Sequence, residues 1–256
     1  MTVTLKLGRQ ARTFNPLVPH YDALTHGMTV PAPPPTRDWS AGMPNNLGAM
    51  LNDELGDCTI AGIYHARQIW SFNANPPIRT APDAKVLKLY ELACGYNPKK
   101  PDTDQGGVEQ DVLSYWLKNG APIASGVDTL SAFVEVNPKN RLSCQGSIND
   151  CGVLYVGMLV PNYIMAGAAP PTVWDLDPAG DQGIAGGHAV AVCGYDATGF
   201  RFNSWGMWYT MTWAFWYKYL DEAYALADPL WIEKSGQSPV WMTLPALEAA
   251  MDVLRT

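Results

Sequence analysis

The sequence predicts an α+β fold in which a mainly helical part precedes a mainly β part. Two patterns carry this prediction. Between Cys58 and Gly120, apolar residues recur at helical spacing, whereas after Gly126 short runs of Val, Phe, Tyr and Trp are separated by Gly, Pro, Asn and Asp. The chain has 256 residues, 47% of them hydrophobic, so it is long enough to bury a sizeable core without stapling.

Three helices are expected in the first part. The first begins near Cys58 with Asp57 as its N-cap, because Ile60, Ile63 and Tyr64 and later apolar residues repeat at three and four positions. The other two span residues 84–94 and 107–119, the last ending at Gly120.

Strands are expected from the β-branched and aromatic runs of the second part. These runs are SAFVEV (131–136), GVLYVGMLV (152–160), HAVAVCGY (188–195), GFRFNSW (199–205), YTMTWAF (209–215) and PLWIE (229–233). The third and fourth are joined by a short turn, which predicts an antiparallel hairpin with Gly199 at a positive φ.

The chain ends extend beyond the expected domain. Residues 1–37 form a Pro-rich arm with a short strand at 3–7, residues 38–126 and 127–232 form the helical and β parts, and residues 233–256 form a C-terminal extension. In that extension, apolar residues spaced by three and four predict an amphipathic helix; they are Leu244, Leu247, Met251 and Leu254. The helix packs either on its own domain or on a partner.

Charge and composition exclude several classes of protein. The net charge is −7 and basic residues do not cluster, which excludes a nucleic-acid binder. The longest apolar run, residues 151–161, is too short to cross a membrane, and the first residues do not resemble a secretory signal, so a cytoplasmic location is expected. Five cysteines without C-x-x-C spacing indicate neither a disulfide framework nor a zinc site, and no cofactor or metal is expected.

Three residue types needed for thiol chemistry occur in these segments. Cys58 stands at a helix N-terminus, where the helix dipole favours a thiolate by ~0.3–2 kcal/mol. His188 leads an apolar strand, and Asn203 lies just past the hairpin, where register allows its amide to orient the imidazole. Trp205 follows closely and can shield that contact from water.

Four blocks, in chain order, carry a resemblance to a known family. They are LGDCTIA, DQGGVEQDVLSYWLKNG, GGHAVAVCGYD and NSWGMWY, preceded by RDWSAGMPNNLGAMLNDELGDC. Over residues 38–232 the chain resembles the papain-like cysteine peptidases, as a divergent bacterial or phage-like member. His188 follows Cys58 at the ~130–150-residue interval of that family.

This resemblance implies a two-lobed fold, a helical lobe and an antiparallel β-barrel-like lobe with the active-site cleft between them. It implies Cys58 as nucleophile, His188 as base and Asn203 as orienter, with Asn52 and Cys58 forming the oxyanion hole. It also implies a substrate cleft lined by Gly106, Gly107, Gly187 and Trp205.

Several positions depart from the family pattern. Asn52 is shorter than the usual glutamine, Thr59 replaces an aromatic residue, and Asp57 brings a negative charge beside the thiol. Leu55 and Gln105 stand where the family commonly has a disulfide, which is consistent with a reducing compartment.

Two functional hypotheses follow. The first is a thiol hydrolase that cleaves peptide or amide bonds of a peptide or protein substrate, with acyl transfer to an amine as a related reaction. The second is a weakly active or inactive structural protein of this fold, such as a virion component, that forms oligomers through its N-terminal arm and C-terminal helix. The arm is accordingly either a short inhibitory plug or an assembly strap.

Two weaker signals are discounted. His65 lies seven residues into the first helix, facing away from its N-terminus, so a packing or surface role is expected. Asp102, Asp104 and Gly106 resemble the start of a calcium loop, but the later ligands are missing.

Overall fold

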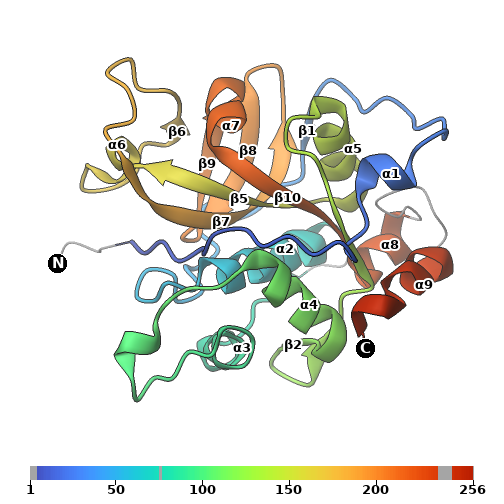
Figure 1. The fold of residues 1–256 in the computed structure, drawn as a ribbon, viewed down its shortest axis with the longest axis horizontal. Helices are drawn as coiled ribbons and strands as arrows, with labels where there is room; N and C mark the ends of the chain where they lie inside the picture. Colours follow the sequence, from blue (N-terminus) through green and yellow to red (C-terminus); the bar gives the residue numbers. More distant parts are fainter. Residues whose placement is uncertain (1–4, 75–76, 236–243, 256) are drawn as a thin grey trace.

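A computed structural model describes residues 5–74, 77–235 and 244–255. A large antiparallel-dominated sheet forms one layer, and helices α2, α3 and α4 lie along one side of it (Figure 1). The expected α+β, two-lobed architecture is confirmed.

The helices have the following bounds: α1 (Tyr21–Leu24), α2 (Cys58–Ala74), α3 (Asp83–Cys94), the 3₁₀ turn η1 (Pro101–Thr103), α4 (Glu109–Asn119), α5 (Arg141–Cys151), α6 (Asn162–Met165), α7 (Trp213–Tyr219), α8 (Pro229–Ser235) and α9 (Leu244–Arg255). The strands are β1 (Arg37–Asp38), β2 (Ala121–Pro122), β3 (Val127–Asp128), β4 (Ala132–Glu135), β5 (Leu154–Pro161), β6 (Val173–Trp174), β7 (Ile184–Tyr195), β8 (Gly199–Ser204), β9 (Met207–Thr212) and β10 (Leu220–Ala227).

The main sheet has the strand order β4-β10-β5-β7-β8-β9-β6, with β1 pairing to β7, and β2 and β3 form a separate ribbon. The neighbours β10, β5, β7, β8 and β9 all run antiparallel. Burial along β7 changes at His188: the residues before it are exposed or half-buried, and those from it to Tyr195 are buried. The histidine is therefore inside the strand, at the point where the strand enters the core.

Helix α2 is the centre of the helical layer and packs against β7. All its residues from Cys58 to Ser71 are buried, so it is surrounded by protein instead of presenting one apolar stripe. Gly62 allows close contact with the sheet, because a Cβ there would lie 2.7 Å from the Tyr155 ring. Trp70 Nε1 donates to Cys151 O at 2.6 Å and joins the other end of α2 to α5.

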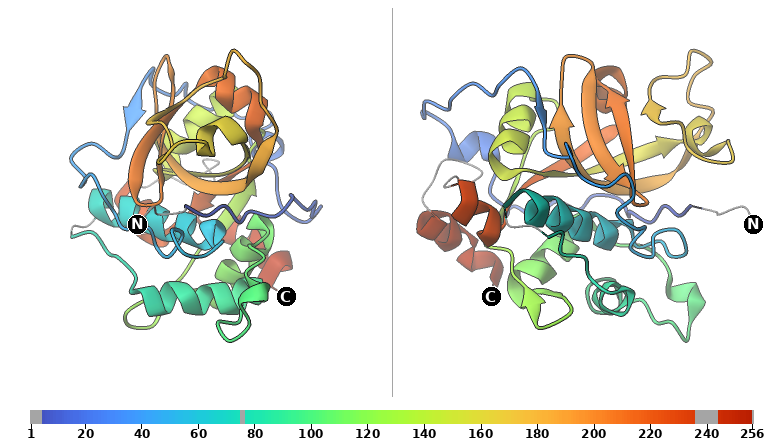
Figure 2. Two further views of the ribbon diagram at one scale, coloured as in Figure 1. Left: turned by 90° about the vertical axis from the view of Figure 1, so that its left-hand side faces the viewer. Right: turned by 180° about the vertical axis from the view of Figure 1, so that it is seen from behind.

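The N-terminal residues 5–12, called the cleft segment below, run along the seam between the sheet and the helices (Figures 1 and 2). Lys6 N donates to Asn52 O, and Gln10 N donates to Gly107 O. Of the strand predicted at residues 3–7, residues 3 and 4 lie outside the described residues. Residues 5–7 form no strand, and the nearest β-bridges join Arg9 to Gly107 and Gly187.

The C-terminal helix α9 packs on its own chain. Leu247 and Met251 are fully buried, Leu254 is partly buried, and Arg255 Nη2 donates to Ser131 O at 2.8 Å. Within the described residues, none of the helices combines the length and the apolar character needed to cross a membrane.

The helices predicted in the first part are confirmed, with α2 beginning at Cys58 and α4 ending before Gly120. The prediction for residues 229–233 is wrong, because they lie in helix α8, and residues 213–215, expected at a strand end, begin helix α7. Strand β10 was not expected, since its sequence LDEAYALA lacks the β-branched residues used as the signal.

The predicted hairpin is present, but not for the reason given. Strands β7 and β8 pair antiparallel, with Ala191 opposite Asn203. Gly199 does not adopt a positive φ; Asp196 Oδ1 organises the turn by accepting from Thr198 N and Gly199 N. Gly199 is required instead for close approach, since a Cβ there would lie 1.9 Å from Met211 O on β9.

We expect Gly199→Ala to lower the free energy of unfolding by about 1–3 kcal/mol, because the added methyl pushes β9 away from β8. Urea unfolding measures this difference. Gly146→Ala is the matched control: Gly146 lies within α5 and its Cβ would make an ordinary 3.4 Å contact, so this change leaves stability unchanged or raises it. Equal effects of the two substitutions would contradict the close-approach explanation.

Candidate active site

Cys58 begins α2 and is 1% exposed, beneath the cleft segment. Burial raises the pKa of its thiol to about 12; hydrogen bonds from the backbone amides of Ala189 and Gly8 act in the opposite direction. The expected thiolate stabilisation at the helix N-terminus is therefore outweighed by desolvation, and at neutral pH the sulfur is a thiol.

His188 is also buried, on the strand beside the sulfur. Burial lowers its pKa to about 3, with a smaller contribution from His65, so its imidazole is neutral. Its Nε2 lies 2.7 Å from Ser204 Oγ, whereas its Nδ1 has no hydrogen-bond partner among the described residues. In the tautomer in which Nε2 donates to Ser204 Oγ, Nδ1 is the nitrogen that accepts a proton.

Asn203 does not make the predicted contact in this structure. The side chain is completely buried, and neither amide atom has a hydrogen-bond partner among the described residues. Ser204, the next residue, makes the bond to His188 instead. Sequence reasoning missed Ser204, although it stands within the NSWG block that drew attention to its neighbour.

Asn52 and Asp57 lie close to Cys58. Asn52 Nδ2 donates to Leu55 O at 3.0 Å, so its amide is engaged within its own loop. Burial raises the pKa of Asp57 well above its usual value, and the nearby Asn52 amide offsets this only in part. The negative charge expected beside the thiol is thereby disfavoured. Asp57 also does not cap α2 with its side chain, because neither carboxylate oxygen accepts a hydrogen bond from the first turn of the helix among the described residues.

Trp205 covers the histidine. The two rings stack with centroids 4.6 Å apart and planes inclined by 18°. Trp205 has φ 49°, a left-handed conformation that is unfavourable for a bulky residue, so the surrounding structure must hold it there. Its Nε1 donates to Lys6 O at 3.0 Å and thus contacts the cleft segment too.

Glycines line the path of the cleft segment on both sides. Gly8 N and Arg9 N both donate to Gly187 O, and Gly107 N donates to Gly8 O at 2.9 Å. A Cβ on Gly106 would lie 1.6 Å from Gly8 O, and a Cβ on Gly187 would lie 2.3 Å from Arg9 O. The residues predicted to line a substrate cleft therefore surround a peptide chain, which is the protein's own N-terminal segment.

Gly8 itself is required at this position. A Cβ on Gly8 would lie 1.7 Å from Gly56 O, in the loop that precedes the nucleophile candidate. Any side chain here would lift the segment away from Cys58. The backbone of Gly8 therefore lies close to the sulfur, with Gly8 N bonded to Gly187 O and Gly8 O bonded to Gly107 N.

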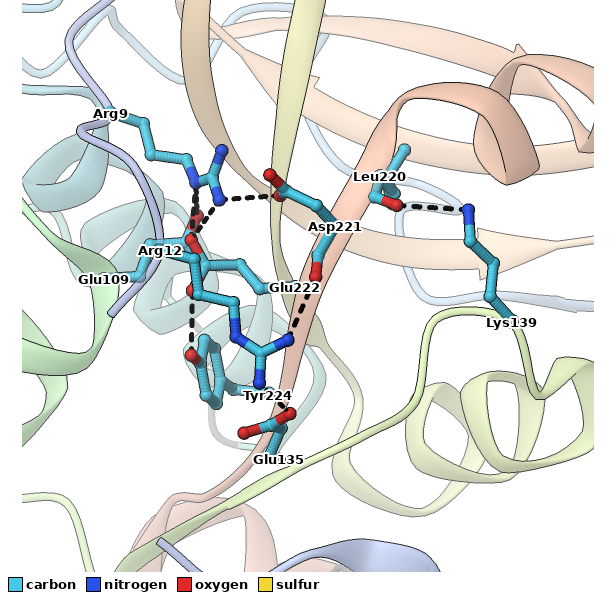
Figure 3. Close-up of polar contacts among 9 residues, drawn as sticks. All are labelled: Arg9, Arg12, Glu109, Glu135, Lys139, Leu220, Asp221, Glu222 and Tyr224. Atoms are coloured by element: carbon cyan, nitrogen blue, oxygen red, sulfur yellow. Dashed lines mark hydrogen bonds and ion pairs between the residues drawn. The ribbon is translucent and has the colours of Figure 1, made fainter. Parts of the chain in front are cut away.

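The Arg9 side chain enters a pocket formed by Glu109, Asp221 and Glu222, called the acidic pocket below (Figure 3). Its Nε donates to Glu222 Oε1 at 2.5 Å and lies 3.3 Å from Glu109 Oε1; its Nη2 donates to Asp221 Oδ1 at 2.6 Å. The side chains of Arg9, Glu109 and Glu222 are at most 1% exposed, whereas Asp221 is 42% exposed. Asp221 thus forms the mouth of the pocket.

Strand irregularity brings two adjacent carboxylates into one pocket. Successive side chains of a regular strand point to opposite faces, but β10 has a register shift against β5 between Leu220 and Glu222. Asp221 and Glu222 can therefore both reach Arg9. Gly157 of β5 makes room for the guanidinium, since a Cβ there would lie 2.2 Å from Arg9 Nε.

The pocket strongly couples its charges. Burial raises the pKa of Glu109 well above its usual value, the neighbouring Glu222 raises it further, and Arg9 opposes both effects. Burial likewise raises the pKa of Glu222, again opposed by Arg9. Tyr224 OH donates to Glu222 Oε2 at 2.8 Å and supplies a second partner for that carboxylate. Arg9 thus opposes the burial that favours the protonated form of both acids.

Sequence reasoning missed this pocket. Its carboxylates come from the start of α4 and the start of β10, and they meet Arg9 only through the fold. The discounted residues have structural roles: His65 Nδ1 lies 2.9 Å from Gln68 Oε1, and Asp104 accepts from Gly56 N and, at 2.6 Å, from Tyr90 OH. The five cysteines are free.

The sequence matches no protein-family model and no curated protein. Solved structures do match. Xylellain, a cysteine protease from Xylella fastidiosa, superposes with a TM-score of 0.67 and 15% identity over 88% of this chain and 97% of its own. A procathepsin B from Trypanosoma congolense superposes with a TM-score of 0.56 and 11% identity, over 87% of this chain and 86% of its own. A cysteine protease from Carica candamarcensis, solved in complex with E-64, superposes with a TM-score of 0.52 and 14% identity, over 76% of this chain and 99% of its own.

We expect the cleft segment to protect Cys58 from alkylation. In the full-length variant Gly8→Val/Arg9→Ala, the segment loses its fit against Gly56 and its buried ion pairs, so labelling of Cys58 by iodoacetamide at pH 7.5 accelerates at least about tenfold. Peptide mapping identifies the labelled cysteine.

Arg12→Ala is the matched control for this experiment. The Arg12 side chain pairs with Glu135 but is 30% exposed, so its loss changes the labelling rate by less than about fivefold. Equal labelling of the wild type and the double variant would show that the segment does not shield the sulfur.

We expect the buried His188 to make stability fall with acidification. Its pKa is lowered to about 3 in the folded chain from an ordinary 6.5, so below pH 6.5 the unfolded chain binds a proton that the folded chain does not. Between pH 6 and 4, the free energy of unfolding of the wild type falls by up to about 1.4 kcal/mol per pH unit more than that of His188→Gln. Denaturant titrations at each pH measure the slopes. His26→Gln, at an exposed position, retains the wild-type slope, and parallel curves for the wild type and His188→Gln would contradict the assignment.

Proposed function

Because the chain has the papain-like cysteine protease fold, we propose that it is a thiol peptidase held latent by its own cleft segment. The observation that carries this proposal is a peptide chain lying across Cys58 and bonded to glycines on both sides of the groove. A groove that binds one extended backbone through Gly107 and Gly187 is suited to bind another.

The proposed reaction uses Cys58 and His188. The Cys58 thiol gives its proton to His188 Nδ1, the nitrogen that has no partner among the described residues, and the thiolate attacks the carbonyl carbon of a peptide bond. When the C–N bond breaks, the imidazolium returns the proton to the leaving amine. Water then adds to the thioester, and the acyl group leaves as a carboxylic acid while the thiol is restored.

Two further groups complete the proposed site. Ser204 bonds to Nε2 and so helps fix the orientation of the ring; Asn203 remains a predicted orienter that would have to change its side-chain conformation. The oxyanion would be bound by the first-turn N–H groups of α2 and by Asn52, whose amide must first leave Leu55 O.

Latency has a geometric explanation. The backbone of Gly8 lies over the sulfur and is held there by hydrogen bonds from Gly8 N to Gly187 O and from Gly107 N to Gly8 O, so a substrate backbone cannot occupy the same place. The contacts of residues 6–12 are made within one chain, which favours the plug interpretation of the arm over the strap.

We expect the full-length Gly8→Val/Arg9→Ala variant to hydrolyse fluorogenic peptide amides, and the wild type to hydrolyse them at least about tenfold more slowly. In the same background, adding Cys58→Ala or His188→Ala lowers kcat at least about 10³-fold, because each removes a reacting group. Initial rates with a peptide mixture provide the measurement.

The orienting residue is tested in that background as well. Ser204→Ala is expected to lower kcat about tenfold or more with little change in KM, since it leaves the imidazole free to rotate, whereas Ser204→Thr retains the hydroxyl and restores activity in part. If Cys58→Ala leaves the rate unchanged, the peptidase proposal is wrong.

A further inference from the structure

The carboxylates of the acidic pocket remain on the body of the protein when the cleft segment leaves it. Glu109 and Glu222 belong to the body of the protein, are fully buried, and have Arg9 as their cationic partner. When the cleft segment leaves, these carboxylates stay behind without that cation. A buried carboxylate without a partner is costly, so the vacated pocket favours any ligand that brings a positive charge to the same place.

The position of the pocket connects it to the peptide groove. Gly8 lies at the sulfur, and the side chain that enters the pocket belongs to the adjacent residue, Arg9. A peptide bound in the groove between Gly107 and Gly187 therefore places one side chain, close to its reacting bond, against Glu109, Asp221 and Glu222. The pocket therefore adjoins the groove that holds the backbone of the cleft segment.

The pocket geometry favours a guanidinium over an ammonium ion. Two different nitrogens of Arg9 are used: Nε contacts Glu222 and Glu109, and Nη2 contacts Asp221 and Glu222. A planar fork can serve carboxylates on two sides at once, whereas the single nitrogen of lysine cannot occupy both positions. The space above Gly157 is shaped to this plane, since even a methyl group there would collide with Nε.

Resting on the proposed peptidase function, we infer that the acidic pocket selects substrates with an arginine side chain next to the residue at Cys58, and that the cleft segment holds this pocket by presenting Arg9 in the same place. The substrate class is thus peptides or unfolded protein segments containing arginine, with lysine accepted less well and acidic residues rejected.

Turnover by the full-length Gly8→Val/Arg9→Ala variant tests the inference. N-acetylated Xaa-Gly coumarylamides with Xaa as Arg, Lys, Leu or Glu are compared, together with the reversed order Gly-Xaa. We expect kcat/KM for Arg-Gly to exceed that for Leu-Gly at least about tenfold, with Lys-Gly between them and Glu-Gly lowest. The inference is overturned if kcat/KM for the Leu peptides equals or exceeds that for the Arg peptides in both orders.

Substitutions that remove one carboxylate at a time identify the residues responsible for the arginine preference. Adding Glu222→Gln or Glu109→Gln keeps the side-chain volume and lowers the Arg-to-Leu ratio at least about fivefold. Glu135→Gln is the matched control, because this acid pairs with Arg12 outside the pocket and its neutralisation leaves the ratio unchanged. A ratio that is insensitive to both pocket substitutions contradicts the assignment.

Binding measured without turnover separates the two proposals. In the Cys58→Ala/Gly8→Val/Arg9→Ala chain, calorimetry with N-acetyl-Arg-Gly-amide is expected to show saturable binding that Glu222→Gln weakens at least about tenfold and that the Leu-Gly analogue lacks. Arginine-dependent binding, together with no hydrolysis by the Gly8→Val/Arg9→Ala variant that keeps Cys58, would contradict the peptidase proposal and support the arginine selectivity of the pocket. Hydrolysis without a preference for arginine would support the peptidase proposal and contradict the selectivity.

Discussion

The ion cluster around Arg9 is the interaction on which the closed state of this protein depends. One guanidinium, 1% exposed, serves two fully buried glutamates and the partly exposed Asp221. Breaking a buried pair by removing one partner typically costs about 3–5 kcal/mol, far more than an exposed ion pair contributes. Because Arg9 comes from the N-terminal segment and Glu109 and Glu222 come from α4 and β10, the cluster joins both sides of the seam through a third element. The segment is therefore a structural part of the closed molecule.

The chemistry of the sulfur and the imidazole follows from that closure. With the segment in place, burial moves the two pKa values apart, that of Cys58 up to about 12 and that of His188 down to about 3. A thiolate–imidazolium pair requires the reverse order, so the closed site favours the neutral pair. Access of water would stabilise both charged forms. In the proposed latent state, the backbone of Gly8 occupies the groove, and the exclusion of water keeps the Cys58 thiol protonated.

The sequence predicts features that depend on neighbouring residues, but not contacts between side chains that are distant in the chain. Helical spacing predicts the start of α2 at Cys58, and two β-rich runs joined by a short turn predict the hairpin that carries His188. The sequence predicts Asn203 as the residue that orients His188, whereas in this structure the neighbouring Ser204 makes the bond to Nε2; strand register alone does not determine which of the two reaches the ring. The Arg9 cluster had no local signal, because its acids lie about a hundred or more residues away in the chain and one depends on a register shift in β10.

Backbone and side-chain recognition are divided between different parts of the groove. Gly107 and Gly187 bond to main-chain atoms, which every peptide has, and their lack of a Cβ brings that main chain close without selecting its sequence. The acidic pocket contacts a side chain, where charge and planarity discriminate. The cleft segment makes both kinds of contact, so a ligand that displaces it must replace both sets. A ligand that offers only main-chain bonds leaves the buried glutamates without a cation, so the same charges that hold the segment in place also set the chemical requirement for whatever takes its position.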